Sequence, residues 1–350
     1  MTDLRGVLAL SRERNYNIEL LRVISCLLVV CIHVSNVYSR GYGEVSGGTY
    51  LFSLMTNCFS RVAVPIFFMI SGYLLLDENV SLRKSVHRVV HTIVVLVFWS
   101  VLYYFWNIVY WGDRYDFKTL FEDPVKKHLW FLYAILGMYI ALPFFQLLFK
   151  KMSRRLMEYF FLLWVFFLTL YYVLAMADME FTYMVPMVGN SSYLGYFVLG
   201  YIMRKFSKYY KLGTKTCFGI VLIVGLINIG LTCYGTFTTG DHEEIYFQYR
   251  NPLIAICSLG VFIGIIEHGK IAFTEAQKSI MQMISRHSFT IYLSHIIFLD
   301  IVKEELEPLD VPGWIGIPLY TVGIFLVTFA FAVAADNAWK HLRTYLPAWM

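Results

Sequence analysis

The segment Asn17-Ile-Glu-Leu-Leu-Arg22-Val-Ile-Ser-Cys-Leu-Leu-Val-Val-Cys-Ile-His33-Val-Ser-Asn36 is long and apolar enough to cross a bilayer, yet it contains Glu19, Arg22 and His33. Ionisable side chains at membrane depth cost free energy and usually serve a function. A helix turns about 100° and rises about 1.5 Å per residue, so the step from Arg22 to His33 returns to nearly the same face about 16 Å further along. One face of this predicted helix therefore presents both groups.

The composition of the whole chain is that of a membrane protein. Its 350 residues are 58% hydrophobic and 15% charged, whereas soluble domains average about 45–50% apolar and about 25% charged residues. A transmembrane helix needs about 20 apolar residues, which predicts an all-α integral membrane protein, a bundle of about ten transmembrane helices in one domain. That domain covers residues 1–350, and its predicted spans are approximately 18–38, 50–76, 89–111, 128–149, 156–177, 187–203, 216–235, 251–266, 285–302 and 314–336.

The distribution of Lys and Arg predicts how this bundle lies in the membrane. Connections on the side of the N-terminus carry most of these residues, so the positive-inside rule places both termini in the cytoplasm. Residues 1–17 are then a cytoplasmic segment and residues 337–350 a cytoplasmic tail, with the first apolar run retained in the inner (plasma) membrane. The net charge of +5 follows from this bias, so we expect contacts with membrane lipid and none with nucleic acid.

Two ionisable residues inside the predicted spans are suited to chemistry. His33 lies in the outer half of the membrane, where a neutral imidazole suits general acid–base catalysis or, alternatively, a hydrogen bond between packed helices. Arg61 lies near the middle of the second predicted span, where a guanidinium must face the protein interior or a wet cavity. It either binds an anion or a carbonyl oxygen, or it forms an ion pair with Glu19. Pro65 is expected to kink this helix.

Polar residues of the fourth and ninth predicted spans form two further groups. His128 and Trp130 open the fourth span, where they either anchor the helix at the outer interface or line a site for a sugar-like molecule. Ser288, Tyr292 and His295 follow a helical spacing, so they share one face of the ninth span. Such a face either lines a cavity or makes a polar contact with another helix.

Cations gather in the inner connections. Arg83, Lys84 and Arg88 precede the third span, and Arg286 lies at the start of the ninth. These residues suit the phosphates of a cytoplasmic donor, although the positive-inside rule alone produces such clusters.

The cysteines occur singly inside apolar runs, without metal-ligand spacing. We therefore expect small core residues, with neither disulfides nor a metal, at Cys26, Cys31, Cys58, Cys217, Cys233 and Cys257.

Taken in order, these motifs resemble the integral-membrane acyltransferase-3 family from about residue 13 to the end. Members of that family move an acyl group, usually acetyl from acetyl-coenzyme A, onto extracytoplasmic sugars. The chain is most similar to the short stand-alone type represented by the O-acetyltransferase of enterobacterial common antigen. No esterase-like or racemase-like domain follows the last predicted span, so we expect the chain to complete its reaction itself. The resemblance is carried by Arg22 and His33, Arg61-Val-Ala-Val-Pro65-Ile-Phe-Phe-Met-Ile-Ser-Gly-Tyr73, His128-Leu-Trp-Phe-Leu, Gly195-Tyr-Phe-Val-Leu-Gly-Tyr201 and Ser288-Phe-Thr-Ile-Tyr-Leu-Ser-His295.

The resemblance implies a membrane O-acetyltransferase that uses acetyl-CoA as the acyl donor. Its acceptor would be a hydroxyl of a sugar or lipid-linked oligosaccharide of a cell-surface polysaccharide. The catalytic residues would be His33, Arg22 and Arg61. On their charge and position, the candidate donor-binding residues are Arg83, Lys84, Arg88 and Arg286, although this inner connection lacks the paired-arginine motif of some members. The acceptor site or cavity would use Glu19, Asn36, His128, Trp130, Ser288, Tyr292 and His295.

Several alternatives stay open at this level. Acetyl transfer is either direct or passes through an acetyl-His33 intermediate, and a homo-oligomer is compatible with the sequence. A transporter or flippase of a polar solute is the competing class of function. Against it, the chain has no inverted repeat and no matched pair of interrupted spans in its two halves.

Overall fold

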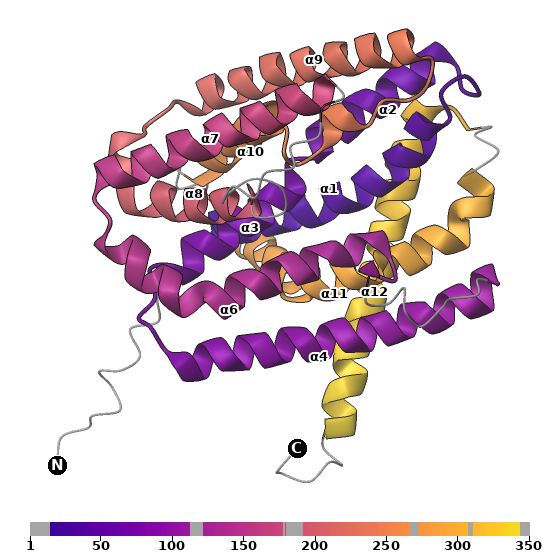
Figure 1. The fold of residues 1–350 in the computed structure, drawn as a ribbon. Helices are drawn as coiled ribbons and strands as arrows, with labels where there is room; N and C mark the ends of the chain where they lie inside the picture. Colours follow the sequence, from indigo (N-terminus) through magenta and orange to yellow (C-terminus); the bar gives the residue numbers. More distant parts are fainter. Residues whose placement is uncertain are drawn as a thin grey trace, which may run out of the picture.

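The computed structural model describes residues 15–112, 122–177, 179, 192–266, 272–306 and 311–343 of the chain. Regular secondary structure in these residues is helical throughout. Most of the two predicted cytoplasmic terminal segments, residues 1–14 and 344–350, lies outside the described residues. The main helices (Figure 1) are α1 (Tyr16–Arg40), α2 (Gly47–Ser60), α3 (Ala63–Leu75), α4 (Leu82–Trp106), α6 (Trp130–Lys151), α7 (Arg154–Met176), α8 (Tyr193–Phe206), α9 (Thr214–Thr239), α10 (Pro252–Ile266), α11 (Glu275–Leu306) and α12 (Gly313–Arg343).

Eight stretches of the described chain are long and apolar enough to cross a membrane, one of them formed by α2 and α3 together. The remaining two predicted spans correspond to α8, which has only 14 residues, and to α11, whose 32 residues include many polar side chains. The chain is therefore a multi-pass membrane protein, and the all-α membrane bundle predicted from its composition is confirmed. One boundary differs, because α12 continues to Arg343, seven residues into the predicted tail.

The second predicted span is divided into two helices at Arg61 and Val62, just before Pro65, although both residues keep right-handed helical backbone angles. Arg61 is the residue that follows α2, and α3 begins at Ala63. Pro65 falls in the first turn of α3, where its missing N–H costs no helical hydrogen bond. Because proline cannot donate to the carbonyl four residues before it, the helix ends there and a new one starts. The break leaves the Arg61 side chain at a helix end in the interior of the bundle.

The helix that carries the decisive segment is central in the bundle. α1 packs against α2, α3, α10, α11 and α12. Figure 1 shows α9 and α7 along one side of the bundle and α4 along the opposite side, with α1 and α3 between them. α4 exposes an apolar face that includes Val94, Phe98 and Phe105, as expected of a helix at the lipid boundary. The polar residues of α1 therefore face protein on several sides.

α3 and α8 approach each other closely at two glycines. A methyl group added at Gly72 would lie 1.6 Å from the Phe197 carbonyl oxygen, and one added at Gly200 would lie 1.9 Å from the Met69 carbonyl oxygen. Both contacts are with backbone, so no side-chain movement relieves them. Small residues allow membrane helices to approach this closely. The pair of glycines holds α3, and with it the break at Arg61, against α8.

The six cysteines are all free thiols, and four of them are buried. This agrees with the prediction that they are small residues of the packed helices.

Candidate active site

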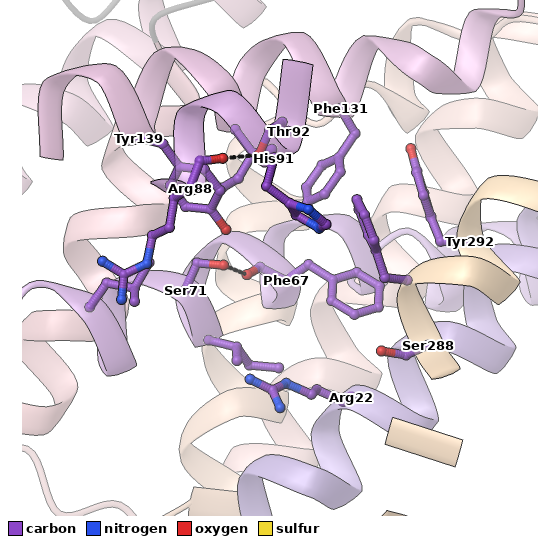
Figure 2. Close-up of a pocket in the computed structure, with 14 residues that line it drawn as sticks. Arg22, Phe67, Ser71, Arg88, His91, Thr92, Phe131, Tyr139, Ser288 and Tyr292 are labelled. Atoms are coloured by element: carbon purple, nitrogen blue, oxygen red, sulfur yellow. Dashed lines mark hydrogen bonds between the residues drawn. The ribbon is translucent and has the colours of Figure 1, made fainter. Parts of the chain in front are cut away.

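A cavity of about 340 Å³ lies between α1, α3, α4, α6 and α11. Its wall is mainly apolar and aromatic with a few polar groups, which is typical of small-molecule sites. In Figure 2, Arg88 lies on one side of the cavity and Tyr292 on the other, with Phe131 beside Tyr292. The lining residues are Arg22, Phe67, Ile70, Ser71, Leu75, Arg88, His91, Thr92, Phe131, Ile135, Tyr139, Ser288, Phe289 and Tyr292.

The cavity extends from the end of the bundle that carries Arg88 toward its middle. Arg88 lines it near the start of α4, the end that the positive-inside rule places in the cytoplasm. α6 runs the other way, so its lining residues pass from Phe131 at the deep end to Tyr139 nearer the cytoplasm. This step of eight residues corresponds to about 12 Å of helix. The deep end is closed by Tyr292, whose ring centre lies 5.3 Å from that of Phe131.

Arg22 reaches the cavity from α1 and is held by a buried carboxylate. Its Nη1 lies 3.7 Å from Oε2 of Glu19, and the Ser285 hydroxyl of α11 donates a hydrogen bond to the same oxygen. Glu19 is 5% exposed, so its charge is matched inside the protein. Glu19 therefore pairs with Arg22. The ion pair between Arg61 and Glu19, one of the two alternatives offered by the sequence, is not formed. Glu19 lies with Arg22 near the start of α1, at the opposite end of this helix from Asn36.

A second, more polar hollow of about 530 Å³ adjoins the cavity at Arg22. Arg22 lines both spaces, so they adjoin each other at this residue. Arg286 contributes a second cation, and its side chain is 62% exposed, with its Nη2 3.9 Å from Oδ2 of Asp336. The remaining lining residues are Ser279, Gln282, Met283, Ser285 and His287.

Three histidines from different helices meet beyond the deep end of the cavity. The ring centre of His295 lies 5.0 Å from that of His33 and 5.4 Å from that of His128. The ring centre of Tyr292, which lines the cavity, lies 5.9 Å from those of both His128 and His295. The cavity and His33 are therefore separated by one layer of aromatic rings.

Backbone carbonyl groups of α11 orient two of these histidines. His295 donates from Nδ1 to the carbonyl oxygen of Tyr292 over 2.6 Å. His128 donates from Nε2 to the carbonyl oxygen of Leu293 over 3.4 Å, and the Tyr292 hydroxyl donates to the His128 carbonyl oxygen. The hydroxyl of Tyr103 on α4 also donates to the Leu293 carbonyl oxygen, over 2.7 Å. These hydrogen bonds thus connect the histidine layer to α4, to α11 and to the helical turn that precedes α6.

Arg61 is held next to this layer by an asparagine one turn earlier. Its Nε donates to Oδ1 of Asn57 over 2.8 Å. The Asn57 amide nitrogen in turn donates to the carbonyl oxygen of Ile32 over 3.3 Å and lies 3.5 Å from Oδ1 of Asn36. Ile32 directly precedes His33, so this network places Arg61 beside the turn of α1 that carries the histidine.

Aromatic rings surround Arg61 and the start of α6. The Arg61 guanidinium carbon lies 5.6 Å from the centre of the Phe247 ring and 5.7 Å from that of Tyr249, distances typical of cation–π contacts. The Trp130 ring centre lies 5.6 Å from that of Tyr249 and 4.8 Å from that of Tyr193. Trp130 therefore packs against aromatic rings from other parts of the chain, which an interfacial anchor alone does not require.

Comparison with known proteins identifies the family. The family model described as the acyltransferase domain, acyltransferase 3, matches residues 15–335. The chain belongs to the acyltransferase-3 family. An amino-acid racemase of Enterococcus faecalis is 30% identical over 141 residues, which cover 38% of this chain and 19% of that protein. No solved structure matches the chain.

The structure brings together most of the residues expected for an acyltransferase-3 site. The cavity is lined by Arg22, Arg88, Ser288 and Tyr292, and the adjoining hollow by Arg286. The other catalytic and acceptor candidates apart from Glu19 lie in or around the histidine layer, namely His33, Asn36, Arg61, His128, Trp130 and His295. The exceptions on the donor side are Arg83 and Lys84, which are exposed at the start of α4 and belong to neither wall.

Other residues of the site were not singled out by the sequence. Asn57 carries a usable signal, because it is a polar residue of a span placed four residues before Arg61, on the same helix face. His91, Thr92 and Tyr139 line the cavity, but side chains of this kind are common in the apolar runs of this chain. Tyr249 comes from the connection before α10, and only the tertiary structure places its ring against Arg61.

Replacing Asn57 with alanine is expected to reduce acyl transfer about 10- to 100-fold, because the Arg61 guanidinium loses the hydrogen bond that positions it. The measurement is the initial rate at saturating acyl donor. Asn79→Ala is the matched control, since Asn79 lies in the connection between α3 and α4, where its side-chain oxygen accepts a hydrogen bond from Lys150 and does not contact Arg61. An unchanged rate for Asn57→Ala would show that the Arg61 position does not depend on this contact.

Proposed function

We propose that this protein is a membrane O-acetyltransferase that moves an acetyl group from cytoplasmic acetyl-CoA to a hydroxyl of an extracytoplasmic or lipid-linked sugar. The observation that supports this most strongly is the arrangement of two spaces that meet at Arg22, with His33 and Arg61 beyond the deep end of one of them. The family match establishes the acyltransferase domain. We propose the acetyl donor and the sugar acceptor in addition.

The shapes of the two spaces suit the two parts of an acyl-CoA. The cavity of about 340 Å³ is narrow and mostly apolar, which suits a thin acyl-pantetheine arm. It is at the small end of the range for ligand sites, about 300–1,000 Å³, so the nucleotide must lie outside it. The polar hollow carries Arg22 and Arg286 and faces the cytoplasmic side, where phosphates are favourably bound by guanidinium groups. Arg88 offers a further cation at the cavity itself, although it is engaged with Glu78 at 2.9 Å.

The arm then points from Arg22 toward the histidine layer. The thioester at its tip reaches the deep end near Tyr292, and movement of the aromatic layer admits it to His33. The acceptor hydroxyl attacks the thioester carbonyl carbon as His33 takes its proton, so that a carbon–oxygen bond forms and the carbon–sulfur bond breaks. The proton passes from His33 to the departing sulfur, which leaves as the free thiol of CoA. Arg61 stabilises the oxyanion that forms at the carbonyl oxygen.

The acceptor approaches from the outer side, where aromatic and polar groups face each other. Trp130, Tyr193 and Tyr249 provide flat rings of the kind on which sugars stack, and Arg61 and Asn36 provide polar contacts. This arrangement favours a sugar over an apolar acceptor. In this proposal the acceptor and the donor bind on opposite sides of His33.

Blocking the cavity tests the donor assignment. We expect acetyl-CoA to raise the unfolding temperature of the purified wild-type protein and to release free thiol when membranes containing surface-polysaccharide precursors are supplied. Ser71→Trp fills the cavity from α3, so stabilisation by acetyl-CoA and thiol release should both be lost. Val94→Trp, on the exposed face of α4, is the matched control and should behave as the wild type.

Two outcomes would contradict the proposal. A folded wild-type protein that is neither stabilised by acetyl-CoA nor able to release thiol would favour the transporter or flippase alternative. Equal stabilisation of wild type and Ser71→Trp would place the donor outside this cavity. Radiolabelled acetyl groups recovered on lipid-linked saccharide, and absent from it in Ser71→Trp, would identify the acceptor class directly.

A further inference from the structure

His295 has a buried ring nitrogen that its surroundings leave unsatisfied. The residue is 0% exposed, and its Nε2 has no hydrogen-bond partner among the described residues. Buried polar atoms without partners are rare in folded proteins and require an explanation. The proposed chemistry of this site, which gives a role to His33, does not by itself account for the unpartnered nitrogen.

The hydrogen bond at the other nitrogen determines what Nε2 offers. Nδ1 lies 2.6 Å from the carbonyl oxygen of Tyr292, and a carbonyl oxygen only accepts hydrogen bonds. The proton is therefore on Nδ1, and in the neutral ring Nε2 carries a lone pair. His295 thus holds a hydrogen-bond acceptor inside the histidine layer.

His33 is the neighbour that is free to donate to this acceptor. Three side chains in ring contact with His295 carry donors, namely His33, His128 and Tyr292. The Nε2–H group of His128 is directed to the Leu293 carbonyl oxygen, and the Tyr292 hydroxyl is directed to the His128 carbonyl oxygen. Among the described residues, no hydrogen bond engages the ring of His33.

The separation of the two rings suits such a bond. Their centres are 5.0 Å apart and their planes are inclined by 50°. In an N–H···N bond of about 2.9 Å, with each nitrogen about 1.1 Å from its ring centre, the two centres lie about 5 Å apart. At this separation, rotation of the His33 side chain can direct its single N–H group at Nε2 of His295.

We propose that His295 positions His33 by accepting a hydrogen bond from it at Nε2. This bond fixes the tautomer of His33, so that its second nitrogen presents a lone pair to the acceptor hydroxyl. It also stabilises the imidazolium that forms when His33 takes the proton, as an orienting group does for the base in other acyl transferases. His295 is thus a positioning residue. This inference rests on the proposed function, in which His33 is the general base.

Two substitutions at His295 distinguish a positioning role from a packing role. His295→Phe keeps a ring but removes the acceptor, whereas His295→Gln places an amide oxygen where Nε2 lies. We expect His295→Phe to lower kcat for acetyl transfer about 100-fold, with the KM for acetyl-CoA and the stabilisation by acetyl-CoA unchanged. His295→Gln should recover activity to within about tenfold of wild type. His87→Phe, at an exposed histidine of α4, is the control.

A spectroscopic measurement decides the hydrogen bond independently of turnover. The measurement is ¹⁵N NMR of protein with labelled histidine, in which the His33 signals are identified by their absence from His33→Gln. These signals should show one tautomer of His33 in wild type and in His295→Gln. They should show a mixture of tautomers in His295→Phe. If the wild-type protein transfers no acetyl groups but the spectra show the expected tautomers, the proposed function is refuted and the hydrogen bond between His33 and His295 is supported. A single His33 tautomer in all three proteins, or a kcat for His295→Phe within threefold of wild type, would refute the positioning role.

Discussion

Replacing His33 with alanine is expected to reduce acetyl transfer by about 10²- to 10⁴-fold, because the acceptor hydroxyl then loses the group that removes its proton. The protein should stay folded and should still be stabilised by acetyl-CoA. This separation is expected because the cavity and the polar hollow are lined by other residues, and His33 lies one ring layer beyond Tyr292. Thiol release and thermal unfolding, measured on the same preparation, test both expectations.

His87→Ala is the matched control for this substitution, because His87 is an exposed histidine near the start of α4 and lines neither space. A His33→Ala protein that transfers acetyl groups at the wild-type rate would remove His33 from the chemistry. A variant that loses both transfer and stabilisation by acetyl-CoA would instead indicate that His33 helps to bind the donor.

Replacing either glycine of the α3–α8 contact with alanine is expected to destabilise the fold by about 3 kcal/mol or more, the upper end of the cost of overpacking. The added methyl group meets a backbone carbonyl at 1.6 Å in Gly72→Ala and at 1.9 Å in Gly200→Ala. The two helices must separate to accept it. Because α3 begins just after Arg61, we also expect the remaining folded protein to lose transfer activity.

Gel filtration and thermal unfolding in detergent measure this effect. Gly137→Ala in α6 and Gly230→Ala in α9 are the controls, since an added methyl group meets nothing within 4 Å at either position. These controls should be neutral or slightly stabilising, because alanine favours a helix over glycine. Unfolding of Gly72→Ala at the wild-type temperature would show that α3 and α8 do not approach as closely as described.

The membrane architecture was predictable because it depends on local composition. Apolar runs of sufficient length become helices wherever backbone groups must be satisfied without water, whatever their neighbours are. Three predicted spans, 187–203, 251–266 and 285–302, are short or polar in sequence. Two of them, which correspond to α8 and α11, fall outside the eight apolar stretches, whereas 251–266 falls within one. α8 packs closely against α3, and polar side chains of α11 line the cavity and the histidine layer.

The position of the helix break shows where local reasoning was insufficient. Pro65 was the correct residue to suspect, but a proline either kinks a helix or starts one, and the sequence alone does not separate these outcomes. In the structure α3 starts two residues before Pro65. The break therefore falls at Arg61, whose guanidinium reaches Asn57 and the rings of Phe247 and Tyr249.

The sequence by itself determined the helical spans and the shared face of Arg22 and His33, because hydropathy and helical spacing act over a few turns. It also determined which buried polar residues needed a partner. Only the tertiary structure decided which polar groups lie together. The contact between His33 and His295 depends on how α1 and α11 cross. The pairs Glu19–Arg22 and Asn57–Arg61 each lie on one stretch of helix, but packing against other helices selects them over other partners. Those crossings depend on close contacts such as Gly72 against Phe197, where long-range packing and not local periodicity selects the geometry.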